Sequence, residues 1–272
     1  MPLNFLQSIK LSGSVGPDLI HEYSEHIFDV YRFSCHDLNS SQVLFNDGIP
    51  SIIFTPQKSD FVYLEEKGCV SRYDSVWVCC GIIENTYWNI PTNIDYITVL
   101  RFKPASFYSL FNVSPTVFFR RPICSLCDIV NDRWMDIFDQ MYEKETLVQR
   151  ISFLDTAFSS FHTESNFPYV LNMATAYIEN EKGNVAVSNV LQRLGKSVNA
   201  KWLHRNFMKY IGISPKRYIS LQRFIYAYQY CKKSKSNDFF DAALCSGYYD
   251  YNHFFKEFKR YTGVGPSQYA WD

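Results

Sequence analysis

Short apolar segments bounded by turn residues dominate the first 115 residues of the chain. Gly, Asn, Asp or Pro separates most of these apolar runs, which cover 43–45, 49–54, 61–64, 76–83 and 96–102. Runs of this length, rich in β-branched and aromatic residues, are typical of strands. The Asn46-Asp47-Gly48 segment between the first two runs is a turn signal of the kind found in hairpins. The pattern predicts a small β-sandwich or barrel.

The spacing of apolar residues becomes helical after residue 104. Pro104 suits the first turn of a short helix over 104–111. Two longer helices are expected within 124–164, on apolar positions that recur three or four residues apart: Ile129, Trp134, Ile137, Phe138 and Met141, then Leu147, Ile151, Leu154 and Phe158. This helical segment either packs on the β-rich part or dimerises. The polar stretch 165–168 predicts a linker.

The last hundred residues alternate short helical patterns with turn signals. Helices are expected over 169–181, 187–194 and 217–231, with Asn199 as the N-cap of a helix between the last two. At 1.5 Å per residue, the helix over 217–231 spans roughly 22 Å. A further unit follows Asp238, where Gly247 ends one helix and Asp250 caps the next.

The two capped helices share one design, with aromatic or aliphatic residues inward and basic residues outward. The inner positions are Leu203, Phe207 and Ile211 in the first, and Phe254, Phe255 and Phe258 in the second. A short helix, a turn and a capped amphipathic helix form the layout of a DNA-reading helix-turn-helix. Both units end alike, in Phe-x-Lys-Tyr-x-Gly-x-x-Pro and Phe-Lys-Arg-Tyr-x-Gly-x-x-Pro, which indicates an internal repeat.

The second unit resembles the signature of AraC/XylS-type bacterial transcription regulators. The matching residues are Ala243-x-x-x-Gly247-Tyr248-x-Asp250-x-x-His253-Phe254-x-x-x-Phe258-Lys259-Arg260-x-x-Gly263-Val264-x-Pro266. The resemblance covers about the last hundred residues and implies two helix-turn-helix units joined by one long helix. It also implies an N-terminal domain that is often a cupin-like jelly roll. The 195–199 turn departs from the family, since it is two residues longer than usual.

The patterns predict an α+β protein with a β-rich barrel or sandwich domain and an all-α double helix-turn-helix domain, and the resemblance implies that the β-rich domain is cupin-like or related. The β-rich sensing or oligomerisation domain is expected over 1–123, and the helical segment over 124–164. The linker occupies 165–168, and the DNA-binding domain 169–272. We expect 169–272 alone to bind duplex DNA and 1–168 not to bind it.

Charge is distributed unevenly between the two halves. Residues 170–272 hold 15 Lys and Arg and 7 Asp and Glu. The whole chain holds 27 Lys and Arg and 27 Asp and Glu, so the residues before 170 hold 12 Lys and Arg and 20 Asp and Glu. The excess is therefore +8 in the C-terminal part and −8 before it. A basic domain behind an acidic one is expected when only one domain meets phosphates.

Nine outward residues are candidates for DNA contact. The resemblance assigns Lys201, His204 and Arg205 to the first reading helix, where Arg205 could instead form an internal salt bridge. Tyr251, Asn252 and Lys256 hold the equivalent places in the second helix. Arg and Asn side chains can bind guanine and adenine bidentately. Lys209, Lys259 and Arg260 are candidates for phosphate contact, with an ordinary solvated face as the alternative.

The eight cysteines lack the spacing of a disulfide framework. Cys231 and Cys245 lie in helical patterns and are expected to be buried. Cys124-x-x-Cys127 allows an alternative function, a thiol-based redox or metal sensor or enzyme. No second pair, His pair, phosphate loop or hydrolase motif accompanies it. We therefore expect no enzyme activity, catalytic residue, metal or cofactor.

Aromatic residues of the β-rich part could line an effector pocket or simply form its core. The candidates are Tyr63, Trp77, Tyr87, Trp88, Tyr96 and Phe102. The expected partners are double-stranded DNA, with RNA polymerase, an unknown small-molecule effector and a second copy of the chain left open. A helix-turn-helix that docks a protein is a further alternative. No apolar run approaches the length of about 18 residues that a membrane span needs, so we expect none, and a cytoplasmic location.

Overall fold

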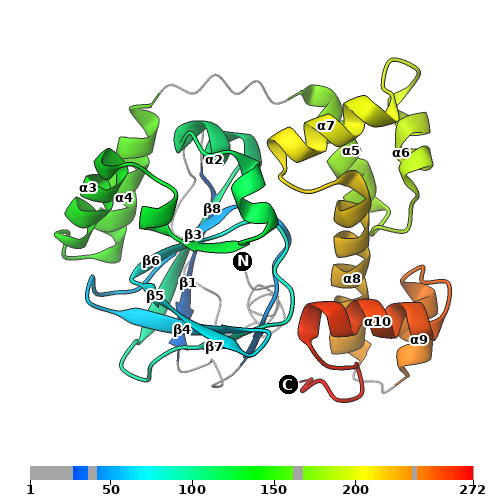
Figure 1. Ribbon diagram of the computed structural model, residues 1–272, viewed down its shortest axis with the longest axis horizontal. Helices are drawn as coiled ribbons and strands as arrows, with labels where there is room; N and C mark the ends of the chain where they lie inside the picture. Colours follow the sequence, from blue (N-terminus) through cyan, green and yellow to red (C-terminus); the bar gives the residue numbers. More distant parts are fainter. Residues whose placement is uncertain (1–26, 36–41, 162–167, 235–237, 272) are drawn as a thin grey trace.

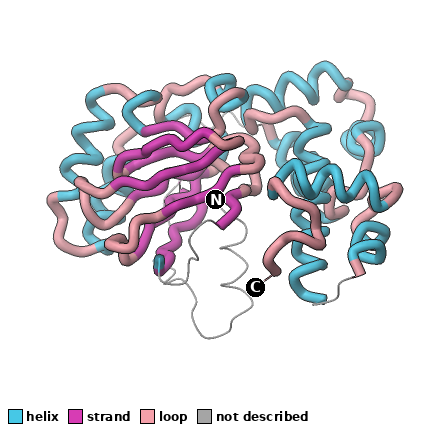
Figure 2. The backbone as a smooth tube through the Cα atoms, turned by 60° about the horizontal axis from the view of Figure 1, so that its bottom comes forward, coloured by secondary structure: helices cyan, strands magenta, loops and turns pink. Residues whose placement is uncertain are grey.

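The computed structural model describes residues 27–35, 42–161, 168–234 and 238–271. In Figure 1 the strands and the first helices lie together, and the later helices form a second body beside them. Figure 2 shows the same division, with the strands on one side and the C-terminal helices on the other. The α+β class with a C-terminal helical region is therefore confirmed.

Two antiparallel sheets form the β-rich part within the described residues. The larger sheet has the order β1-β8-β3-β6-β9, with bounds Ile27–Ser34, Tyr96–Phe102, Ser51–Phe54, Val76–Cys79 and Ile123–Ser125. The smaller sheet has the order β2-β7-β4-β5, with bounds Gln42–Leu44, Thr86–Asn89, Phe61–Glu66 and Cys69–Asp74.

Alternate residues of the larger sheet serve two different cores. In β3, Ile53 packs with Trp88 of β7 in the core between the sheets. Its neighbours Ile52 and Phe54 belong to a second core on the opposite face, with Phe158. Because side chains point to alternate faces along a strand, a strand buried on both faces reads as a continuous apolar run.

Helices cover the outer face of the larger sheet. They are α2 (Pro104–Leu110), α3 (Asp132–Tyr142) and α4 (Leu147–Ser159), with short 3-10 turns η2 (Pro115–Phe119) and η3 (Leu126–Asp128). Trp134, Phe138 and Phe158 fill this layer and are at most 3% exposed. Arg150 of α4 also donates to the Pro56 carbonyl at 2.6 Å, which holds the helices on the sheet.

The Asn46-Asp47-Gly48 segment is not a hairpin turn. Strands β2 and β3 lie in different sheets, so the segment carries the chain from one sheet to the other. The buried Asn46 side chain accepts from the Ile83 amide at 3.1 Å and donates to the Gly81 carbonyl at 2.9 Å. Asp47 forms an ion pair with Arg101 of β8. These long-range bonds replace the local pairing that the sequence signal predicted.

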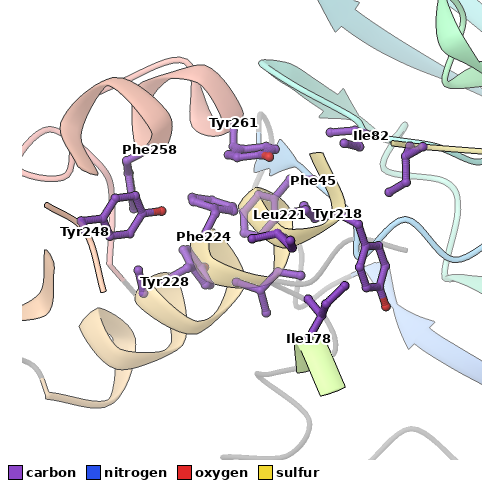
Figure 3. Close-up of a cluster of buried hydrophobic side chains, with 14 of the residues drawn as sticks. Phe45, Ile82, Ile178, Tyr218, Leu221, Phe224, Tyr228, Tyr248, Phe258 and Tyr261 are labelled. Atoms are coloured by element: carbon purple, nitrogen blue, oxygen red, sulfur yellow. The ribbon is translucent and has the colours of Figure 1, made fainter. Parts of the chain in front are cut away.

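The C-terminal part consists of helices in the described residues. They are α5 (Tyr169–Asn180), α6 (Val187–Leu194), α7 (Ala200–Tyr210), α8 (Pro215–Ser234), α9 (Phe239–Cys245) and α10 (Tyr251–Thr262). Buried residues from α8 lie at the centre of their common core, where Phe224 stacks on Tyr261 with ring centroids 4.2 Å apart. Figure 3 shows this cluster around α8.

Three residues of the β-rich part, Val43, Phe45 and Ile82, belong to the C-terminal core. Figure 3 shows Phe45 beside Leu221 and Phe224, with Ile82 at the edge of the same cluster. Phe45 meets Phe224 and Tyr228 edge-on at centroid distances of 5.2 and 4.8 Å. The two bodies are therefore joined by apolar packing.

Candidate nucleic-acid interface

Both candidate reading helices begin at side-chain caps. Asn199 Oδ1 accepts from the Trp202 amide at 2.8 Å, and Asp250 Oδ1 accepts from the His253 amide at 2.7 Å. A capping side chain satisfies an amide that has no partner within the helix, and so fixes where the helix starts. The caps expected at Asn199 and Asp250 are confirmed.

Replacing Asp250 with Ala should lower the free energy of unfolding by about 1 kcal/mol, because the His253 amide loses its acceptor. Asp250→Asn is the matched control, since Asn caps about as well and should change stability much less. Urea unfolding of the two variants measures the difference. Equal losses in both would show that charge, and not the cap, sets the stability of α10.

Glycines shape the turns that precede the caps. Gly195 ends α6 with φ 85°, and Gly247 follows α9 with φ 77°. Side chains with a Cβ are strained in this region of backbone conformation. In the 195–199 turn, Val198 is buried in the C-terminal core, which anchors the turn. After α9, the Tyr248 amide bonds back to the Ala243 carbonyl at 3.0 Å.

Helix α8 separates the two units. It has 20 residues and is longer than the expected 217–231. At 1.5 Å per residue, a helix of this length spans about 30 Å. It begins at Pro215, where proline is favoured in a first helical turn. Its apolar residues contact both units, so α8 sets the spacing between α7 and α10.

The nine candidate contact residues all lie on α7 or α10 (Figure 1). Tyr251 is half-buried; the exposed ones are Lys201, His204, Arg205, Lys209, Asn252, Lys256, Lys259 and Arg260. Leu203 and Phe207 on α7, and Phe254 and Phe258 on α10, are fully buried. Each helix thus turns an apolar side to the core and a mainly basic side to solvent. Lys209 also lies over the Tyr210 ring, 4.8 Å from its centroid.

Residues 196–270 match the family model described as a helix-turn-helix domain. This part of the chain is an AraC-type helix-turn-helix domain. We use the name AraC-type domain for the C-terminal part that contains it, from α5 to α10. No curated protein matches the chain.

Solved structures similar to this chain include those of ToxT from Vibrio cholerae. The apo structure of a single-residue ToxT variant has 15% identity and a TM-score of 0.46, with 91% of this chain and 98% of that chain covered. A second ToxT structure has 15% identity and a TM-score of 0.45, with coverages of 88% and 95%. The unsaturated-fatty-acid-bound ToxT structure has 16% identity and a TM-score of 0.42, with coverages of 92% and 96%.

The β-rich part touches the AraC-type domain at the ends of both reading helices. Glu84 forms ion pairs with Arg217 and with Arg260, each at 2.8 Å. Beside it, the Asn85 amide donates to the Tyr261 carbonyl at 2.9 Å. At the end of α7, the Tyr108 hydroxyl donates to the Ile211 carbonyl at 3.3 Å. Sequence reasoning missed Glu84 and Arg217, since no local signal pairs residues 133 positions apart.

A cavity of about 340 Å³ opens between the two bodies. The AraC-type domain contributes His204 and Met208 of α7 and the 212–214 turn, while the other side includes Lys67 and Arg120. The cavity also reaches Glu84 and Arg217. One candidate base-reading residue, His204, therefore lies beside the β-rich part.

The six aromatic effector candidates do not gather around one cavity. Trp77 and Trp88 meet edge-on at 5.6 Å in the core between the sheets, and Phe102 lies on the opposite face of the larger sheet. Tyr63 is exposed, and Tyr96 lies under Arg32, whose guanidinium carbon is 4.2 Å from the ring centroid. The Tyr87 hydroxyl bonds to the Thr262 carbonyl at 3.3 Å. None of the six lines the 340 Å³ cavity.

The cysteines do not form a reactive or metal-binding cluster in the described part of the chain. Cys124 is buried, and its thiol donates to the Arg121 carbonyl at 3.2 Å. Burial raises the pKa of this thiol, although Arg121 opposes the shift. Only a small fraction of Cys124 is therefore in the reactive thiolate form. Cys127 is exposed. Among the described residues, no group of three or more His, Cys, Asp or Glu could hold a metal ion.

The prediction that Cys231 and Cys245 are both buried is right for one of them. Cys231 is buried, as expected, whereas Cys245 is exposed, because it lies on the outer side of the short helix α9. Leu244 beside it is 49% exposed, and only Ala242 and Ala243 of that helix are fully buried.

Within the described ranges, no helix has both the length and the apolar character needed to cross a membrane.

Proposed function

We propose that the protein is a sequence-specific, DNA-binding transcription regulator whose reading helices are α7 and α10. The observation that carries this proposal is the pair of capped helices, which present basic residues to solvent within a domain of the AraC type. The excess of 15 Lys and Arg over 7 Asp and Glu in 170–272 provides the electrostatic attraction to phosphates.

The geometry of α8 favours a DNA site in two parts. Its length of about 30 Å is close to one turn of duplex DNA, about 34 Å. Two reading helices at its sides can therefore enter successive major grooves with modest bending of the DNA. The two halves should differ in sequence, because Lys201, His204 and Arg205 are chemically unlike Tyr251, Asn252 and Lys256.

The full-length protein is the right material for the first test, since Phe45 and Ile82 complete the core of the AraC-type domain. We expect selection from genomic DNA to recover a bipartite sequence. Binding to it should weaken steeply as salt rises, because each neutralised phosphate releases a counterion. DNA recognition would be contradicted if no sequence is enriched, or if the affinity does not change with salt concentration. Either result would favour a helix-turn-helix that docks a protein.

Arg205 is assigned to base reading and Lys259 to phosphate contact. Arg205→Ala should weaken binding by about 1–3 kcal/mol and relax the sequence preference in one half of the site only. Lys259→Ala, the matched control, should weaken binding to all sequences alike and lower the salt slope by about one. Both side chains are exposed, so neither change should unfold the protein. If Arg205→Ala also weakens binding to all sequences alike, Arg205 is a phosphate contact.

We also propose that the regulator responds to a small-molecule effector held in the cavity between the two bodies. The support is the volume of about 340 Å³ and the presence of His204 and Met208 of α7 in its wall. A molecule bound there would touch a reading helix directly. Native mass spectrometry of the purified full-length protein tests for such a ligand, and Met208→Trp should reduce its occupancy by filling the space.

The domain limits at 123, 164 and 168 are a proposal. The division at the 165–168 segment is supported by two cores, one with buried residues only from before the segment and one with most of its buried residues from after it. The limit at 123 separates strands from helices that share one core. Homodimerisation and contact with RNA polymerase are proposals that rest on the AraC-type domain. Light scattering of the free protein and of its DNA complex would give the number of chains in each.

A further inference from the structure

A single carboxylate of the β-rich part joins two arginines of the AraC-type domain. Arg217 lies in the first turn of α8, and Arg260 lies in the last turn of α10. One guanidinium nitrogen from each lies 2.8 Å from the same oxygen, Oε1 of Glu84. Glu84 is 22% exposed, whereas the arginines are 44% and 47% exposed. The two arginines therefore form an anion site that is accessible to solvent and is occupied by Glu84 of the same chain.

Backbone contacts place Glu84 in this site. The next residue, Asn85, donates its amide to the Tyr261 carbonyl at 2.9 Å and has φ 48°. Tyr87 binds the carbonyl of Thr262. Gly263 leaves room for this approach, since a Cβ there would lie 2.1 Å from Asn85 Oδ1. The segment that carries Glu84 is thus held against the end of α10 by more than the ion pairs.

The surroundings of the two arginines connect them to the proposed DNA-binding surface. Arg260 lies one helical turn beyond Lys256, so the two side chains emerge on the same side of α10. Arg217 lines the same cavity as His204 of α7. Two guanidinium groups on one oxygen suit a phosphate, which presents several oxygens to planar donors.

We infer that Glu84 occupies a phosphate-binding site of the AraC-type domain, and that a backbone phosphate of duplex DNA takes its place when the protein binds. This inference rests on the proposed DNA-binding function. Glu84 and the phosphate compete for Arg217 and Arg260, so the acidic residue weakens DNA binding by the free protein. The β-rich part thereby restrains both helix-turn-helix units through one side chain.

Glu84→Gln tests the competition in the full-length protein. Removing the charge should strengthen binding to the selected duplex about three- to tenfold at about 0.1 M salt, the range expected for partly exposed ion pairs. The salt slope should stay about the same, because Arg217 and Arg260 contact the same phosphate in both complexes. Glu66→Gln is the matched control, because Glu66 lines the same cavity but pairs only with Lys67 among the ion pairs found in the described residues, at 3.8 Å.

Two further variants separate the contact from net charge and from unfolding. Glu84→Asp keeps the charge but shortens the side chain by one methylene, so any gain in affinity above that of Glu66→Gln comes from the lost contact. In an Arg217→Ala/Arg260→Ala background, Glu84→Gln should give no more than the Glu66→Gln control. Thermal unfolding of each variant shows that the fold is intact.

The outcomes distinguish this inference from the function on which it rests. If the wild type binds DNA and Glu84→Gln matches Glu66→Gln in affinity, the competition is wrong and the DNA-binding function stands. A gain that persists without both arginines also overturns it. If neither the wild type nor any variant binds duplex DNA, the function and the inference are both wrong.

Discussion

Replacing Phe45 with Ala should lower the free energy of unfolding by about 3–5 kcal/mol. Phe45 belongs to the β-rich part, yet its side chain is fully buried in the core of the AraC-type domain. It meets the rings of Phe224 and Tyr228 edge-on, so the Ala variant leaves a cavity against α8 as well as losing apolar burial. The loss should also loosen the junction between the two bodies.

Phe240→Ala is the matched control for this change. It removes the same atoms from α9, where Phe240 is 58% exposed. A change at so exposed a position should alter stability by less than about 0.5 kcal/mol. Urea unfolding followed by Trp fluorescence compares the variants, and a second transition in Phe45→Ala would report separate unfolding of the two bodies. A loss below about 1 kcal/mol would mean that the AraC-type domain closes its core without Phe45.

Local signals predicted the C-terminal helices well. The limits of α6 agree with the predicted 187–194, and the caps at Asn199 and Asp250 are both present. Helical periodicity and capping act within about one turn of the chain, so a short window of sequence contains the determinants. The two repeated units carry these signals twice.

The β-rich part was harder to predict because sheets depend on distant partners. Strands β1, β5, β7 and β9 lie outside the predicted runs. Exposure explains one omission, since β5 has mostly exposed residues and lies at the edge of its sheet. The chain bends at Gly48, but the path after Phe45 depends on the bonds from Asn46 to Gly81 and Ile83, more than thirty positions away.

The candidate site was predicted only in part, again because some of its contacts join segments that are distant in the sequence. Exposure on α7 and α10 follows from the helical period, so the outward residues could be chosen from the sequence. Contacts between the two bodies could not be predicted from the sequence, because Glu84 lies in a segment with no motif and its partners are far along the chain. Aromatic residues of the strands also give no sequence signal that separates a pocket from a core, and Trp77, Trp88 and Phe102 are core.

Gly183→Ala should lower the free energy of unfolding by about 2–5 kcal/mol. Gly183 follows α5 with φ 69°, and a Cβ there would lie 2.3 Å from the Arg223 amide nitrogen and 2.5 Å from the Ile219 carbonyl oxygen, both in the backbone of α8. A left-handed backbone costs an alanine about 1–2 kcal/mol, and the overlap with a helix backbone adds about 1–3 kcal/mol. Arg223 Nε also donates to the Gly183 carbonyl at 3.1 Å, so the turn cannot move away without losing this bond.

Gly195→Ala is the control that isolates the backbone term. Gly195 has φ 85°, but no atom outside the adjoining residues lies within 4 Å of where its Cβ would stand. This variant should therefore lose only about 1–2 kcal/mol. Urea unfolding gives both losses, and their difference measures the close approach to α8.

Because Gly183 fixes the turn between α5 and α6 on α8, we expect Gly183→Ala also to weaken binding to the first half of the DNA site more than to the second. Binding to duplexes in which one half at a time is scrambled measures the two effects separately. Equal losses of stability in Gly183→Ala and Gly195→Ala would show that the turn shifts freely on α8. The spacing between the reading helices would then rest on the core side chains alone.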